Sequence, residues 1–139
     1  SIGIKEAGMV SSCMLIVFIS FIAFSSACSC SESSMEEIFC LSEFVSKVRV
    51  THGVARADVM IYTVVHITIF KQPENSTLSN DIYSPISSAT CGVQLSNGEY
   101  IVLAGDLIDD HLSINRCSTI DPAFNTCEFT SMNCTTILL

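Results

Sequence analysis

Positive charge is scarce in this sequence. It contains 6 lysines and arginines against 14 aspartates and glutamates, and its formal net charge is −8. Nucleic acid and heparin are bound by basic patches, and the chain offers none. We therefore expect no nucleic-acid partner, and the acidity itself is typical of a soluble surface.

Catalytic and metal-binding motifs are also missing. The three histidines are scattered: His52, His66 and His111. They do not form His-Glu-x-x-His or another metal-ligand spacing, and no Gly-x-Ser-x-Gly elbow or glycine-rich phosphate loop occurs. His66 falls within a predicted strand, which favours a packed or rim residue. The acidic cluster of Asp106, Asp109 and Asp110 favours a solvated turn over a cation site. The sequence thus indicates a binding protein with no cofactor of its own rather than an enzyme.

Residues 1–27 are predicted to be a signal peptide. Ser12 to Phe24 is a nearly unbroken apolar run, shorter than the ~20 residues of a membrane span. The small residues of Ser25-Ser26-Ala27 fit a signal-peptidase site directly after it. An uncleaved anchor or a buried helix is the alternative, and Met9 is an alternative start. Cleavage predicts a secreted, extracellular protein without a membrane span, in which residues 28–139 form one domain.

The cysteines predict a disulfide framework. Of eight cysteines, Cys13 lies in the leader, and the others belong to the mature part: Cys28, Cys30, Cys40, Cys91, Cys117, Cys127 and Cys134. A secretory leader with this cysteine density favours disulfides over metal ligation. Because the mature number is odd, at least one thiol is unpaired, bonded to another chain or an artefact of the C-terminal sequence. Asn75-Ser76-Thr77 adds a glycosylation sequon in a turn-rich stretch.

Hydrophobic alternation predicts a mainly β fold. Phe44 to Val50 and Met60 to Phe70 have strand periodicity, with Gly53 to Asp58 as a short connection in place of an extended hairpin. The Asn97-Gly98 pair is the strongest hairpin signal. The remaining strands are expected at Asp81–Pro85 (an edge strand), Tyr100–Ala104 and His111–Asn115.

Short helices are expected at both ends of this β region. Ser34-Met35-Glu36-Glu37 matches a capping box, so a helix should follow with Cys40 at or just past its end. Asp121-Pro122 has the pattern of a cap and first residue of a terminal helix. Five strands with short connections favour a closed or nearly closed barrel of the oligonucleotide/oligosaccharide-binding (OB) type, and a sandwich remains open.

Several of these segments resemble one known family. The stretch Cys28-Ser29-Cys30-Ser31 with Phe39-Cys40 looks like the start of the N-terminal, netrin-like domain of the tissue inhibitors of metalloproteinases. The resemblance continues through four further segments: Ile67–Lys71, Ile82–Val93 with its Ser-Ala-Thr-Cys-Gly, Glu99–Gly105 and His111–Cys117. It implies a five-stranded netrin-like OB-fold barrel with disulfide staples. We expect a single-domain, invertebrate-like form that lacks the family's second, C-terminal domain.

The resemblance also implies a disulfide pattern. Six cysteines can pair in many ways, and physics alone does not choose among them. The family pattern implies Cys28–Cys91 and Cys30–Cys117, with Cys40 bonded to the last cysteine of the domain. Cys127-Glu128 resembles the family's closing Cys-Glu, so Cys127 is preferred for Cys40 and Cys134 is the alternative.

The function implied is inhibition of zinc metalloendopeptidases of the matrix metalloproteinase type. After cleavage, the α-amine and carbonyl oxygen of Cys28 would chelate the catalytic zinc, which the target protease supplies. Ser29 would point into the S1′ pocket, and Cys30 and Ser31 would continue the bound strand. The non-primed side would be filled by a second segment: Ser88, Ala89, Thr90 and Cys91. The extracellular matrix is expected as a further partner of the inhibitor.

Two rival interpretations are kept. The first is a netrin-like extracellular adhesion or signalling module without inhibitory activity, in which Cys28-Ser29-Cys30 is only a structural staple. The chain's acidity and a leader that ends at Cys28 favour inhibition over this alternative. The second is a secreted enzyme, which no motif supports.

Overall fold

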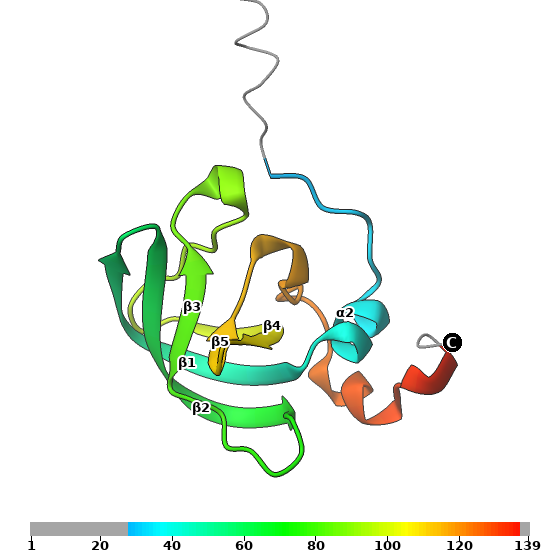
Figure 1. The fold of residues 1–139 in the computed structure, drawn as a ribbon. Coiled ribbons are helices and arrows are strands. Elements are labelled where there is room, and N and C mark those ends of the chain that lie inside the picture. The colour runs from blue at the N-terminus through cyan, green and yellow to red at the C-terminus, as the bar shows by residue number, and fades with distance from the viewer. Residues whose placement is uncertain (1–27, 137–139) are drawn as a thin grey trace, which may run out of the picture.

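The computed structural model describes residues 28–136, so the predicted signal peptide at 1–27 lies outside the described residues (Figure 1). Within that range, none of the helices is long and apolar enough to cross a membrane. The elements, in chain order, are α2 (Met35–Leu41), β1 (Phe44–Arg56), β2 (Val59–Lys71), β3 (Asp81–Pro85), the 3-10 helix η1 (Ser88–Thr90), β4 (Tyr100–Ile108), β5 (His111–Ser113), and the 3-10 helices η2 (Arg116–Ser118), η3 (Thr126–Ser131) and η4 (Cys134–Thr136).

The five strands close into a barrel in the order β1-β2-β3-β5-β4. Neighbouring strands are antiparallel except for β3 and β5, which run parallel. This is the five-stranded barrel with flanking short helices that the sequence predicts. One detail differs, because β3 is bonded to β2 on one side and to β5 on the other and is therefore not an edge strand.

Strand β1 separates two hydrophobic cores. Phe44, Val48 and Val50 point into the barrel and are fully buried, as their alternation predicts. Val45 points to the other face, where it packs in a second core under α2. The other members of the second core come from α2, β4 and the C-terminal segment: Ile38, Phe39, Cys40, Ala104, Ile120 and Phe129. A strand buried on both faces fixes its register strongly, because a one-residue slip would exchange the two cores.

Helix α2 begins and ends as its sequence dictates. The Ser34 side chain accepts a hydrogen bond from the backbone N–H of Glu37, which confirms the predicted cap. At the other end, Lys71 Nζ donates to the carbonyl oxygens of Phe39 and Cys40 at 3.0 and 2.9 Å. Burial lowers the pKa of Lys71, and the nearby Asp106 carboxylate opposes that shift. The lysine thereby ties the end of β2 to carbonyl groups that the helix leaves unpaired.

The hairpin between β1 and β2 is longer than predicted. Its strands stay paired out to Arg56 and Val59, so the expected connection from Gly53 to Asp58 shrinks to a two-residue turn. A side chain at Gly53 would lie only 2.9 Å from ring atoms of Tyr62 on the paired strand. The glycine therefore makes room for an aromatic ring inside the ladder rather than marking a loop, and the expectation of a short hairpin is wrong.

The Asn97-Gly98 pair forms a turn but not a hairpin, because no strand precedes it. The preceding segment packs against the barrel core through Val93 and Leu95 instead. There the Tyr62 hydroxyl donates to the Val93 carbonyl oxygen at 2.8 Å and accepts from the Leu95 N–H at 3.2 Å. These bonds occupy the backbone that a hairpin partner would have needed.

His66 and the acidic residues form hydrogen bonds or turns of the fold itself. His66 Nε2 lies 2.8 Å from the Ser79 carbonyl oxygen, and its Nδ1 lies 2.8 Å from Ser46 Oγ. A carbonyl oxygen only accepts, so Nε2 donates to Ser79, and in the neutral ring Nδ1 is then an acceptor facing the serine hydroxyl. Asp109 and Asp110, both exposed and both at positive φ, form the two-residue turn between β4 and β5. The prediction of a packed or rim histidine is confirmed, and so is the solvated turn at Asp109 and Asp110. The expected placement of Asp106 in the same turn is wrong, because it lies in β4, where its carboxylate accepts from the Glu43 N–H at 3.3 Å.

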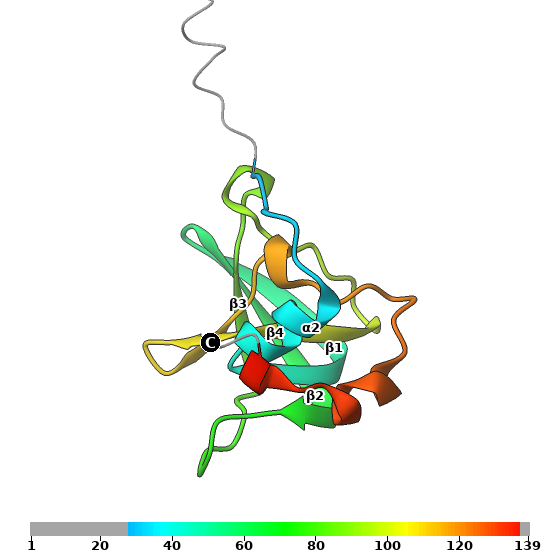
Figure 2. The ribbon, with the colours of Figure 1, turned by 90° about the vertical axis from the view of Figure 1, so that its right-hand side faces the viewer.

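Within the described residues, the C-terminal segment forms no α-helix, so the prediction of a terminal helix from Asp121-Pro122 is wrong. A turn and short 3-10 helices close the second core instead. The Asp121 side chain caps a turn by accepting from the Ala123 N–H at 2.9 Å. Further on, the Phe129 ring stacks on Phe39 with centroids 4.6 Å apart. Figure 2 shows this C-terminal segment beside α2.

Cys40 is bonded to Cys134, with a Cα–Cα distance of 5.2 Å, and Cys127 is a free, exposed thiol. The preference for Cys127 is therefore wrong, and the alternative partner is the right one. The reason lies in η3, where Phe129 faces the core. A 3-10 helix has three residues per turn, so Cys127, two positions earlier, projects from another side of it.

This pairing predicts that two similar cysteine substitutions change the free energy of unfolding by very different amounts. Cys134→Ser removes the staple between α2 and the C-terminal segment and should lower the free energy of unfolding by about 2–5 kcal/mol. Cys127→Ser changes only an exposed thiol and should alter it by no more than about 0.5 kcal/mol. Denaturant unfolding of both variants measures the difference. A larger loss for Cys127→Ser would show that Cys40 pairs with Cys127.

Candidate functional site

The candidate site lies at one end of the molecule, where the described chain begins. Two disulfides attach this N-terminal segment to the barrel: Cys28–Cys91 and Cys30–Cys117, with Cα–Cα distances of 5.1 and 5.3 Å. These are the pairs that the family resemblance implied. Figures 1 and 2 show the segment running from this end, beside the loop that carries η1, down to α2.

The segment from Cys28 to Glu32 depends on these bonds for its attachment. Among the described residues, no hydrogen bond links this stretch to the barrel. Ser29, Cys30 and Ser31 are exposed, and Cys28 is half-buried against its partner. The two covalent links therefore hold an otherwise unpaired strand in one place while its outer surface stays open to a partner.

The neighbouring loop is held by its own hydrogen bonds. The Ser87 side chain accepts from the Ala89 N–H at 3.1 Å, and the Thr90 hydroxyl donates to the Ser87 carbonyl oxygen at 3.0 Å. Cys91 follows in the left-handed conformation, at φ 66°. Ser88, Ala89 and Thr90 are all exposed. The loop thus presents three small side chains on a backbone that is locally fixed.

The surroundings of Gly92 explain why a glycine follows Ser-Ala-Thr-Cys. Its N–H donates to the Ser87 carbonyl oxygen at 2.9 Å and closes the loop. A Cβ at this position would collide with the Pro85 carbonyl oxygen and lie 2.8 Å from the Ser87 carbonyl oxygen. Only a residue without a side chain lets the two ends of the loop approach this closely.

The two barrel cysteines are tied to each other through Arg116. Its backbone N–H donates to the Cys91 carbonyl oxygen at 2.9 Å, and its guanidinium Nη2 donates to the Ser88 carbonyl oxygen at 3.2 Å. Asn115 caps the following turn by accepting from the Cys117 N–H at 2.8 Å. Sequence reasoning missed Ser87, Gly92, Asn115 and Arg116, although the serine and asparagine each stand before a short turn and could have been recognised as caps.

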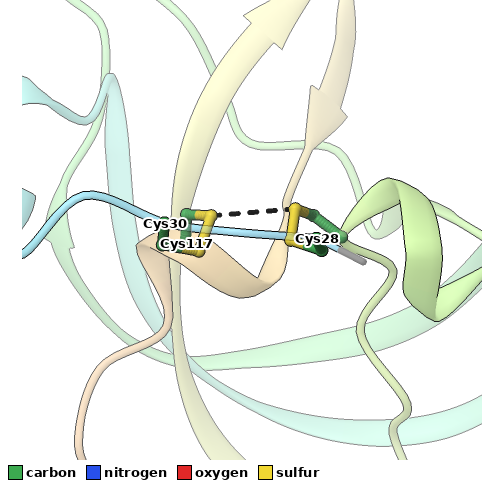
Figure 3. A group of neighbouring side chains, drawn as sticks. Cys28, Cys30 and Cys117 are labelled. Atoms are coloured by element: carbon green, nitrogen blue, oxygen red, sulfur yellow. Dashed lines mark hydrogen bonds between the residues drawn. A yellow bond between two sulfur atoms is a disulfide. The ribbon is translucent and has the colours of Figure 1, made fainter. Parts of the chain in front are cut away.

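The four sulfur atoms of the site form a tight group. All of them lie within 4.8 Å of one another, and Cys91 Sγ is 3.8 Å from Cys117 Sγ (Figure 3). Such a group could suggest a metal centre, but a metal ligand must be a thiolate. Each of these sulfurs is bonded in a disulfide, so the group is a double staple and not a metal site.

The structure brings the predicted site residues together. The segment Cys28–Ser31 and the loop Ser88–Cys91 are adjacent because a disulfide joins them. Asn75 lies elsewhere, exposed in the loop between β2 and β3 with φ at 59°. In Figures 1 and 2 that loop is at the opposite end of the barrel from the described N-terminal segment.

Comparison with known proteins assigns a family to this arrangement. A family model described as "Tissue inhibitor of metalloproteinase" matches residues 26–133. The chain is 33% identical over 103 residues to a Caenorhabditis elegans protein named "Putative metalloproteinase inhibitor tag-225", which covers 66% of this chain and 65% of that protein. It is 28% identical over 108 residues to Metalloproteinase inhibitor 4 of Mus musculus, which covers 69% of this chain and 48% of that protein.

The chain thus spans about two thirds of the length of one relative and about half of the other. Members of this family inhibit proteases and are not themselves enzymes. Because the family model matches most of the sequence, from just before Cys28 to just before Cys134, the chain belongs to the tissue inhibitor of metalloproteinase family.

Proposed function

We propose that this protein is a secreted inhibitor of zinc metalloendopeptidases of the matrix metalloproteinase type, and that its inhibitory group is the N-terminus created by removal of residues 1–27. The observation that carries the proposal is the position of Cys28, half-buried at the start of an exposed segment that two disulfides fix beside the loop Ser88–Thr90. In a member of this family, that arrangement suits a strand and a loop that enter a protease cleft together.

The chemistry follows from the open coordination position of a catalytic zinc, which normally holds water. A free α-amine has an unperturbed pKa of about 8, so its deprotonation near neutral pH costs little free energy. The amine and the carbonyl oxygen of Cys28 would chelate the zinc and displace the water. The sulfur of Cys28 would not be a ligand because it is bonded to Cys91. The zinc belongs to the protease, and the inhibitor needs no cofactor of its own.

The rigidity of the site supports tight binding. Ordering a free tail on binding would cost about 1–2 kcal/mol for each residue whose backbone becomes fixed. Disulfides at Cys28 and Cys30 remove most of that cost before the complex forms. Ser29, exposed between them, would then point into the S1′ pocket, and Ser88, Ala89 and Thr90 would contact the non-primed side.

A glycan at Asn75 is compatible with this function. The residue is exposed, and its loop lies at the far end of the barrel from Cys28. We propose that the sequon is used on secretion and that the glycan leaves the protease-binding surface open.

The chelation mechanism requires an unblocked N-terminus. One alanine added before Cys28 converts its amine into an amide nitrogen without a free lone pair and adds bulk against the zinc. We expect inhibition of a matrix metalloproteinase to weaken by at least about 100-fold, equivalent to about 2.7 kcal/mol. Inhibition constants measure the loss, and mass spectrometry first establishes that the unmodified protein begins at Cys28.

The matched control carries the same alanine after Leu139. It should inhibit like the unmodified protein, and circular dichroism and thermal unfolding should be unchanged for both variants. Undiminished inhibition by the N-terminally extended protein would contradict zinc chelation. A protein that inhibits no metalloproteinase even without the extension would instead favour a netrin-like adhesion module.

Ser29 should tune the choice of target. Its short side chain fills little of a deep S1′ pocket, so Ser29→Gly should weaken binding to several proteases by about 3- to 10-fold, a loss of roughly 1 kcal/mol. Ser29→Leu should redistribute affinity toward proteases with deeper pockets. A panel of inhibition constants measures both effects, and Ser33→Gly, in an exposed residue nearby, is the control. Constants that stay the same for both Ser29 variants would refute this placement of the side chain.

A further inference from the structure

The two disulfides of the site touch each other. Cys91 Sγ and Cys117 Sγ, which belong to different bridges, are 3.8 Å apart, and the dashed line in Figure 3 marks this contact. The two N-terminal sulfurs, of Cys28 and Cys30, complete a group in which no pair is farther apart than 4.8 Å. Disulfide exchange requires a thiolate to reach a disulfide sulfur. Here the sulfurs of Cys91 and Cys117 are already close to van der Waals contact.

We propose that these four cysteines form a thiol–disulfide exchange site, at which a dithiol reductant releases the N-terminal segment and leaves a new Cys91–Cys117 bond in the barrel. The reductant is an external dithiol, such as dithiothreitol or the two-cysteine site of an oxidoreductase. The reaction is a two-electron reduction of the four-cysteine group. Both original disulfides are lost, one new disulfide forms between Cys91 and Cys117, and Cys28 and Cys30 become thiols.

The first step is attack on the outer bridge. Cys30 is exposed, whereas Cys117 is half-buried, so a thiolate of the dithiol attacks Cys30 Sγ and expels Cys117 as a thiolate. The second thiol of the reagent then resolves the mixed disulfide. Cys30 becomes a thiol, and the reagent is oxidised to its own disulfide.

The second step is internal. The Cys117 thiolate attacks Cys91 Sγ, a bond forms between them, and the Cys28–Cys91 bond breaks. Cys28 leaves as a thiolate and takes up a proton. In total one dithiol is oxidised, its two hydrogens end on Cys28 and Cys30, and the two bridges are replaced by one.

The structure of the barrel favours the Cys91–Cys117 product over a product in which Cys28 or Cys30 stays bonded to the barrel. Cys91 and Cys117 are already held together by the Arg116 N–H bond to the Cys91 carbonyl oxygen, at 2.9 Å. The segment Cys28–Glu32 has no such bonds to the barrel among the described residues. A bridge that keeps Cys28 or Cys30 attached must order this segment, at about 1–2 kcal/mol of backbone entropy per residue. A Cys91–Cys117 bridge avoids that cost.

The consequence for inhibition depends on the proposed function. Exchange would free Cys28 from the position in which its amine and carbonyl oxygen meet the zinc. The barrel would keep the Cys40–Cys134 staple and gain the new bridge, so its fold should persist. The site would then act as a redox switch that turns inhibition off without unfolding the protein.

Disulfide mapping tests the exchange directly. The secreted protein is treated with a limiting amount of dithiothreitol, quenched with acid, labelled with N-ethylmaleimide and digested without reduction. Cys127 is free and should be labelled in every sample, treated or not. After treatment we expect new label on Cys28 and Cys30 together with a peptide pair joined by Cys91–Cys117. Label on Cys30 and Cys117 with Cys28–Cys91 intact, or on Cys28 and Cys91 with Cys30–Cys117 intact, would overturn the proposal. An inhibition assay on the same samples keeps the two proposals apart, because exchange without any loss of inhibition would support this inference and contradict the proposal that Cys28 must be held in place to inhibit.

A pair of variants tests whether the barrel cysteines bond when left alone. In Cys28→Ser/Cys30→Ser, we expect Cys91 and Cys117 to be unreactive toward N-ethylmaleimide in the folded protein and to appear as one cross-linked peptide pair. In the control, Cys91→Ser/Cys117→Ser, Cys28 and Cys30 lie in the unattached segment and should be labelled. Labelling of Cys91 and Cys117 in a folded first variant would overturn the proposal, and if that variant does not fold, the mapping of the unmodified protein decides.

Discussion

The proposed function depends on the covalent attachment of a segment that the barrel otherwise does not hold. From Cys28 to Glu32 the chain adds no strand to the sheet and, in the range that the structure describes, forms no hydrogen bond with it. A strand paired into the sheet would have its backbone groups occupied by neighbours. A strand attached only through side-chain sulfurs keeps its N–H and C=O groups available for a partner, and its entropy has already been reduced.

The hydrophobic cores of the barrel, in turn, are built without residues of the site. Strand β1 is buried on both faces, with Val48 in the inner core and Val45 in the core beneath α2. Neither core includes a residue of the N-terminal segment, and the Cys40–Cys134 bridge staples α2 to the C-terminal turns independently. Changes at Ser29, which makes no bond to the barrel in the described range, should therefore affect recognition without a large cost in stability, whereas a substitution of Cys28 would also remove a disulfide. This separation is what makes the inhibition variants interpretable.

The sequence was most informative where one physical signal decided the structure. Alternation placed Phe44, Val48 and Val50 in the core, and the cap at Ser34 located α2, because each depends on a few neighbouring residues. It was misleading where a local signal was overridden by a distant contact. Gly53 has the pattern of a loop residue, yet it lies in a strand to accommodate the Tyr62 ring, which no local pattern reveals.

The disulfides show the same limit. The pairs of Cys28 and Cys30 followed from family resemblance, since spacing alone does not choose a connectivity. The partner of Cys40 could not be chosen from sequence because the choice depends on which face of η3 is buried. Once Phe129 stacks on Phe39, Cys127 is directed away and Cys134 takes its place.

The small side chains of the site complete the physical argument. Ser29, Ser88 and Ala89 project little beyond the backbone, so the shape that a partner meets is largely the course of the main chain. That course is set in the loop by Ser87 and Gly92 and in the N-terminal segment by the disulfides. Shape complementarity at this surface is thus controlled by bonds that lie beneath it. A reagent that rearranges those bonds would alter recognition without touching an exposed side chain of the loop.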